Sequence, residues 1–82
     1  MTREITLFTR QDCGLCHEAA ADLRTLQHEL DFALVERDID ADPDLRSRYN
    51  ERVPVIAAGD EVIAESPIDI DALRRHLAAV LR

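Results

Sequence analysis

The sequence predicts an α/β domain with its elements in the order β-α-β-α-β-β-α. Three observations predict this order. A β-branched and aromatic segment near the start stands directly before a long stretch with apolar residues at three- and four-residue spacing. A second strand pattern follows that stretch. A tight turn near residue 59 then connects two further strand patterns, and a last amphipathic segment follows them. The length of 82 residues suits one compact domain, so we expect residues 1–82 to form a single domain.

The first strand is predicted over Ile5-Thr6-Leu7-Phe8-Thr9, and the turn-forming segment Gln11-Asp12-Cys13-Gly14 ends it. A helix should then run from about Leu15 to Leu30. Its apolar positions recur on one face, and they are Cys16, Ala19, Ala20, Leu23, Leu26 and Leu30. A second strand is predicted from Phe32 to Ile39. Because a helix joins these two strands, we expect them to be parallel, with a right-handed crossover.

The second half of the chain predicts two helices around a hairpin. Asp42-Pro43-Asp44 supplies an N-cap, a proline at the first helical position and an acid in the first turn, so a short helix through Leu45 to Tyr49 should follow. The hairpin is predicted from Arg52–Ala58 and Glu61–Ala64, which the turn Gly59-Asp60 connects.

The last helix is predicted to begin at Ser66-Pro67-Ile68-Asp69, which resembles a capping box with proline at the first helical position. Its apolar face would comprise Ile70, Leu73, Leu77, Val80 and Leu81.

Charge and hydropathy limit the partners. Ten basic residues, all of them arginines, stand against seventeen acidic ones, and the net charge of −7 repels phosphate backbones and anionic lipid headgroups. We therefore expect neither nucleic acid nor a membrane surface as a partner. Apolar runs are only a few residues long, and Met1-Thr2-Arg3-Glu4 contains no apolar signal core, so we expect a cytoplasmic protein. We also expect it to be a monomer.

The chemistry is predicted at Cys13-Gly14-Leu15-Cys16, on the turn from the first strand into its helix. Two intervening residues keep the sulfurs within bonding reach, and free backbone N–H groups at a helix start favour a thiolate on the first cysteine. We predict that Cys13 is the nucleophile and Cys16 the resolving thiol, in exchange with a disulfide-containing protein or a small-thiol substrate. Arg10 would stabilise the thiolate, whereas Asp12 would oppose it. A bridge this short constrains the unfolded chain by only about 2 kcal/mol, so a purely structural role is disfavoured.

Three alternatives remain open. Cys13-Gly14-Leu15-Cys16-His17 also fits the C-x-x-C-H signature of c-type haem attachment, which requires export and a second axial ligand. Cys13, Cys16 and His17 are candidate zinc ligands, although a structural zinc site takes four and the chain has no second C-x-x-C. The third alternative is a binding domain that keeps the cysteines without catalysis. We expect neither a bound metal nor a bound cofactor.

These residues resemble glutaredoxins of the thioredoxin superfamily, over essentially the whole chain. Phe8-Thr9-Arg10-Gln11-Asp12-Cys13-Gly14-Leu15-Cys16 is similar to the family's strand, basic residue and active-site pair, and Val53-Pro54 is similar to its valine and cis-proline. The resemblance implies a thioredoxin fold, with a central four-stranded mixed sheet flanked by helices, and a thiol-disulfide oxidoreductase activity. It also implies that Pro54 is cis and packs against the sulfurs, that the Val53 backbone pairs with an extended substrate, and that Arg10 contacts the substrate.

The sequence departs from the glutaredoxin pattern at two places. The usual Pro-Tyr between the cysteines is Gly14-Leu15 here, and these residues tune the reduction potential. Where glutaredoxins hold the free carboxylate and amine of glutathione on a Gly-Gly-Cys-Asp-like stretch, this chain has Ala64-Glu65-Ser66-Pro67-Ile68-Asp69. Glu65 adds a negative charge there, and Pro67 removes a backbone donor. The electron donor is therefore either glutathione, which these departures disfavour, or a reductase.

Overall fold

The computed structural model describes residues 3–81 and contains one mixed sheet with the strand order β2-β1-β3-β4. The strands are β1 (Glu4–Thr9), β2 (Ala33–Asp38), β3 (Val55–Ala58) and β4 (Glu61–Glu65). Strand β1 runs parallel to β2 and antiparallel to β3, and β3 pairs antiparallel with β4. The predicted parallel pair, the predicted hairpin and the element order are therefore confirmed.

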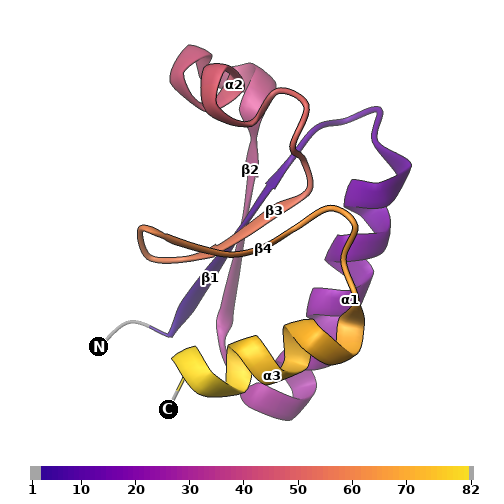
Figure 1. Ribbon diagram of the computed structural model, residues 1–82, viewed down its shortest axis with the longest axis vertical. Coiled ribbons are helices and arrows are strands. Elements are labelled where there is room, and N and C mark those ends of the chain that lie inside the picture. Colours follow the sequence, from indigo (N-terminus) through magenta and orange to yellow (C-terminus); the bar gives the residue numbers. More distant parts are fainter. Residues whose placement is uncertain (1–2, 82) are drawn as a thin grey trace.

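Three α-helices flank the sheet, and they are α1 (Gly14–Leu30), α2 (Pro43–Tyr49) and α3 (Ile70–Val80). A short 3-10 helix, η1 (Ile39–Ala41), precedes α2. Figure 1 shows α1 and α3 packed beside each other against the sheet, with α2 at the end where β2 finishes. Within residues 3–81, no helix is both long enough and apolar enough to cross a bilayer.

The core lies on both faces of the sheet because side chains alternate along each strand. The larger cluster joins the sheet to α1 and α3, and its fully buried members are Ile5, Leu7, Leu23, Leu26, Ile56 and Leu77. The smaller cluster joins the opposite face to α2 and consists of Ile39, Tyr49 and Val55, with Phe8, Leu45 and Val53 packed against it. The Tyr49 ring stacks on the Phe8 ring at a centroid distance of 4.6 Å. The Tyr49 ring is therefore the aromatic contact between α2 and this face of the sheet.

Helices α1 and α2 begin where their sequence signals place them. Cys13 is the N-cap of α1, and Asp42 is the N-cap of α2 with Pro43 at its first position. The turn before β4 uses Gly59 with a φ of 61°, a conformation that favours glycine.

Two boundaries differ from the prediction by more than one residue. Strand β3 begins at Val55 rather than Arg52, because the preceding residues form a loop around a cis Val53–Pro54 bond. The prediction that Ser66-Pro67 starts the last helix is wrong. The Ser66–Pro67 bond is also cis, and α3 begins at Ile70, where the Asp69 side chain accepts the N–H groups of Asp71 and Ala72. Asp69 therefore supplies the cap that the sequence suggested for Ser66.

Candidate active site

Cys13 and Cys16 are joined by a disulfide at the start of α1, with their Cα atoms 5.2 Å apart. The Cys16 side chain is completely buried, whereas Cys13 is partly exposed. Cys13 has extended backbone angles as the N-cap, and its Sγ accepts the backbone N–H of Cys16 at 3.1 Å. The Cys13 sulfur is thus partly exposed to solvent at the N-terminus of α1, and the Cys16 sulfur is buried behind it.

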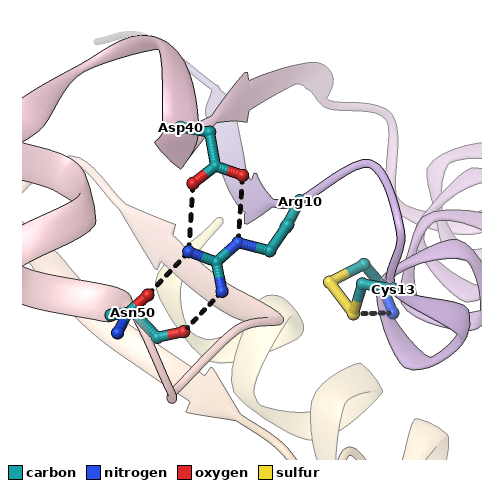
Figure 2. Close-up of a disulfide and its surroundings, with 5 residues drawn as sticks. Arg10, Cys13, Asp40 and Asn50 are labelled. Carbon is teal, nitrogen blue, oxygen red and sulfur yellow. Dashed lines mark hydrogen bonds and ion pairs between the residues drawn. A yellow bond between two sulfur atoms is a disulfide. The ribbon is translucent and has the colours of Figure 1, made fainter.

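Arg10 lies on the loop between β1 and α1, but its guanidinium is directed away from the sulfurs. Figure 2 shows it placed between Asp40 and Asn50. Its Nε and Nη2 each donate to an Asp40 carboxylate oxygen at 3.0 Å, and it also bonds the Asn50 side-chain and main-chain oxygens. The hydrogen bond from Arg10 holds the pKa of Asp40 below its ordinary value, and the same bond raises the pKa of Arg10. Arg10 therefore ties the active-site loop to η1 and to the end of α2.

Val53 and Pro54 form the second part of the site. Their peptide bond is cis, as the glutaredoxin resemblance implies, and the Pro54 side chain is fully buried. The Pro54 carbonyl accepts the Ser66 N–H at 3.1 Å, so the loop before β3 lies against the loop after β4. Within residues 3–81, neither the N–H nor the carbonyl of Val53 takes part in a hydrogen bond.

An ion pair also joins the loop before β3 to the end of β4. Arg52 donates from Nε and Nη2 to the two Glu65 carboxylate oxygens at 3.0 and 2.7 Å. These hydrogen bonds keep the pKa of Glu65 below its ordinary value and raise the pKa of Arg52. The Arg52 guanidinium also lies 5.3 Å from the centre of the Tyr49 ring. The charge of Glu65 is therefore balanced within the structure, which the sequence alone did not indicate.

Comparison with known proteins assigns the chain to a family. The profile described as Glutaredoxin-like domain (DUF836) matches residues 4–78. The chain belongs to this glutaredoxin-like family. Its membership agrees with the thioredoxin fold built by the sheet and the three helices.

Solved structures of similar proteins support the assignment. The chain is 34% identical to protein XcR50 from X. campestris, with a TM-score of 0.78 and coverage of 92% of this chain and 96% of that one. It is 33% identical to protein Ne2328 from Nitrosomonas europaea, again with a TM-score of 0.78, and the match covers 93% and 92% of the two chains. A thioredoxin mutant from Halobacterium salinarum is 28% identical, with a TM-score of 0.72 and coverage of 96% and 74%.

Among curated proteins, an uncharacterized protein of Mycobacterium tuberculosis is 29% identical over 80 residues, which are 92% of this chain and 82% of that protein. The names of XcR50, Ne2328 and the mycobacterial protein state no activity. The glutaredoxin-like family and its thioredoxin fold are therefore shown, whereas the reaction has to be argued from the site.

The structure brings together most of the residues that the sequence singled out. Cys13 and Cys16 are joined by a disulfide, and Leu15, between them in the sequence, lines the same groove as Pro54. The partners of Arg10 and Glu65 were missed, since they lie thirty or more and thirteen residues away in the chain. In the described part of the chain, no three His, Cys, Asp or Glu side chains are grouped so that they could hold a metal ion.

Proposed function

We propose that this glutaredoxin-like protein is a thiol-disulfide oxidoreductase with Cys13 as nucleophile and Cys16 as resolving thiol. The observation that carries the proposal is the asymmetry of the pair. Cys13 is partly exposed at a helix N-terminus and accepts a backbone N–H, while Cys16 is buried behind it. Partial positive charge at a helix N-terminus stabilises a thiolate, so the reachable sulfur is also the activated one.

The reaction begins with the reduced pair. The Cys13 thiolate attacks one sulfur of the substrate disulfide, forms a mixed disulfide and releases the other substrate sulfur as a thiolate. Cys16 then loses its proton, attacks the Cys13 sulfur and displaces the second substrate thiol. The substrate gains two electrons, and its two thiolates take up the proton released by Cys16 and one from solvent. The protein ends with the Cys13–Cys16 disulfide seen in the structure. A thiol or dithiol donor returns the pair to the reduced state by the same steps in reverse.

The loop before β3 supplies the substrate contact in this proposal. The unpaired backbone groups of Val53 stand beside the buried Pro54, at the point where the ladder between β3 and β4 begins. An extended peptide gains affinity by pairing with free backbone groups of this kind. Val53 therefore aligns the substrate, and Pro54 forms a fixed wall beside the cysteines.

Arg10 acts as a positioning residue in the arrangement observed here. Its guanidinium is satisfied by Asp40 and Asn50, which anchors the loop between β1 and α1 to η1 and to the end of α2. The sequence prediction of a direct substrate contact by Arg10 would require it to leave these partners.

Glutathione is the weaker of the two donors that the sequence left open. The Asp69 carboxylate already accepts the free N–H groups at the start of α3, so these donors are not open to a glutathione carboxylate. Arg52, the nearest cation to the Val53-Pro54 loop in sequence, is neutralised by Glu65. We therefore favour reduction by a thioredoxin-type reductase system, in a cytoplasmic location where thiols are kept reduced.

A redox titration of the Cys13/Cys16 couple tests the proposal, followed by turnover of a model protein disulfide with each donor supplied separately. We expect a reversible two-electron couple and faster turnover with the reductase than with glutathione. A pair that exchanges with neither donor would favour the alternative of a binding domain without catalysis.

A further inference from the structure

A small groove opens between α1 and the loops that carry the two cis-prolines, and its lining includes Leu15, which lies between the two cysteines in the sequence. It holds about 160 Å³, close to the ~150 Å³ cavity that accommodates a benzene molecule, so it has room for one side chain. Its walls include Leu15 and Ala19 from α1, together with Pro54 and Ile68 from the loops. Leu15 lies between the two cysteines and is 58% exposed, which is unusual for a leucine in this structure.

The rim of this groove is acidic. Glu18 and Asp22 lie three and seven positions after Leu15, so they share its face of α1. Neither carboxylate forms an ion pair or a hydrogen bond within residues 3–81, whereas Glu29, Glu36 and Glu65 are all paired with arginines. The lining contains no Arg or His side chain among the described residues. The groove therefore combines an apolar wall with two carboxylates, those of Glu18 and Asp22, whose charges are not neutralised.

This combination matches one class of side chain. Arginine and lysine have long aliphatic stems that pack on apolar surface and charged heads that remain near water or an anion. A stem lying on Leu15 and Ile68 would bring its cation to Glu18 and Asp22. An acidic side chain in the same place would meet uncompensated repulsion.

We propose that the groove selects protein disulfides whose reactive cysteine is followed or preceded by an arginine or lysine. The inference rests on the proposed redox function and names its substrate class. The cation enters the groove while the neighbouring sulfur lies at Cys13, and the substrate backbone runs past Val53. The same charges disfavour glutathione, which carries two carboxylates against one amine.

Blocked peptide disulfides that differ only in the residue next to cysteine test this inference. Arginine, leucine and glutamate are compared at that position, and kcat/KM is measured at low and at high salt. We expect the arginine peptide to exceed the glutamate peptide by about tenfold at low salt, and the ratio to shrink at high salt because rim charges are screened. The double variant Glu18→Gln/Asp22→Asn should bring the ratio close to one.

Glu61→Gln is the matched control. Glu61 starts β4 next to the hairpin turn, at the opposite end of β3 from Pro54, and makes no ion pair within the described residues. It removes one negative charge far from the groove, so the arginine preference should stay unchanged. Because the readout is a ratio within one protein, a general loss of stability in a variant does not mimic the result.

The possible failures are distinguishable. If all three peptides are reduced at equal rates, or if leucine is preferred and the double variant changes nothing, the groove inference is overturned and the redox function stands. If the wild-type protein reduces none of the peptides, the redox function fails and the inference fails with it.

Discussion

The backbone N–H of Cys16 donates to the Sγ of Cys13 at 3.1 Å, in the first turn of α1. This bond points the positive end of the helix at the more exposed sulfur. We predict that the Cys13 thiol has a pKa below its ordinary value and is alkylated at neutral pH at least about tenfold faster than a free cysteine. Alkylation rates as a function of pH in the Cys16→Ser variant measure this. The buried Cys16 in Cys13→Ser is the internal control and should react slowly, and equal rates for the two variants would contradict the account.

Removing the charge of Glu65 should change how the oxidised protein reacts with glutathione. In Glu65→Gln, the Arg52 guanidinium loses its carboxylate partner and becomes available to an anionic thiol. We expect glutathione to reduce the Cys13–Cys16 disulfide severalfold faster than in the wild type. The reaction can be followed by stopped-flow or by quenched alkylation.

Arg52→Gln provides the opposite change at the same ion pair. It leaves Glu65 without a cation, so glutathione should react more slowly than with the wild type. If both variants match the wild type, the ion pair has no influence on the donor and the argument against glutathione is weakened.

The bond between Arg10 and Asp40 makes a pH-dependent contribution to stability. Asp40 has a folded-state pKa below its ordinary value of 3.8 because Arg10 hydrogen-bonds to it. The contribution is therefore complete above about pH 3.8 and is lost as the pH falls through the lower folded-state pKa. Urea unfolding of the wild type and of Asp40→Asn should differ at neutral pH and converge in acid. For the control Asp60→Asn, in the hairpin turn, the difference from the wild type should not change in this way with pH. A difference between the wild type and Asp40→Asn that persists down to about pH 2 would contradict the assignment of the pH dependence to the Arg10–Asp40 bond.

The aromatic pair Phe8 and Tyr49 should dominate the attachment of α2. Tyr49 is buried, its ring stacks on Phe8, and the Arg52 guanidinium lies over the same ring. Tyr49→Ala therefore removes contacts with two residues. We expect a loss of about 3 kcal/mol in the free energy of unfolding, measured by urea denaturation. The Tyr49 hydroxyl makes no hydrogen bond within residues 3–81, so Tyr49→Phe should stay within about 0.5 kcal/mol of the wild type. A large loss in Tyr49→Phe would mean that the hydroxyl carries the effect.

Local signals in the sequence predicted much of this fold. The N-cap and proline of α2 are adjacent in the chain, and the periodicity of α1 is carried by its own residues, so both helices lie where expected. The start of α3 was mispredicted because Ser66-Pro67 and Asp69 offer competing helix starts. In the structure Ser66 instead donates its N–H to the Pro54 carbonyl, a tertiary contact that the local sequence does not indicate, and Asp69 caps α3.

The residues of the candidate site also differ in how far the local sequence could predict them. Cys13 and Cys16 were found because their chemistry is local, and the family resemblance supplied Val53 and Pro54. The destination of the Arg10 side chain depends on Asp40 and Asn50, which the fold brings from far along the chain. One wall of the acidic groove could have been predicted from the sequence, since Leu15, Glu18 and Asp22 share one helix face. Its other wall comes from the loop before β3 and the loop after β4, which only the fold brings to α1.

The most direct test of the account is to trap the mixed disulfide. Reduced Cys16→Ser and reduced Cys13→Ser are each mixed with a peptide disulfide, quenched with acid and analysed by intact and peptide mass spectrometry. The account predicts a stable adduct on Cys13 of the Cys16→Ser protein and little or none on Cys16 of the Cys13→Ser protein, because Cys16 is buried. An adduct that forms faster on Cys16, or none on either variant, would contradict the assignment of Cys13 as the nucleophile.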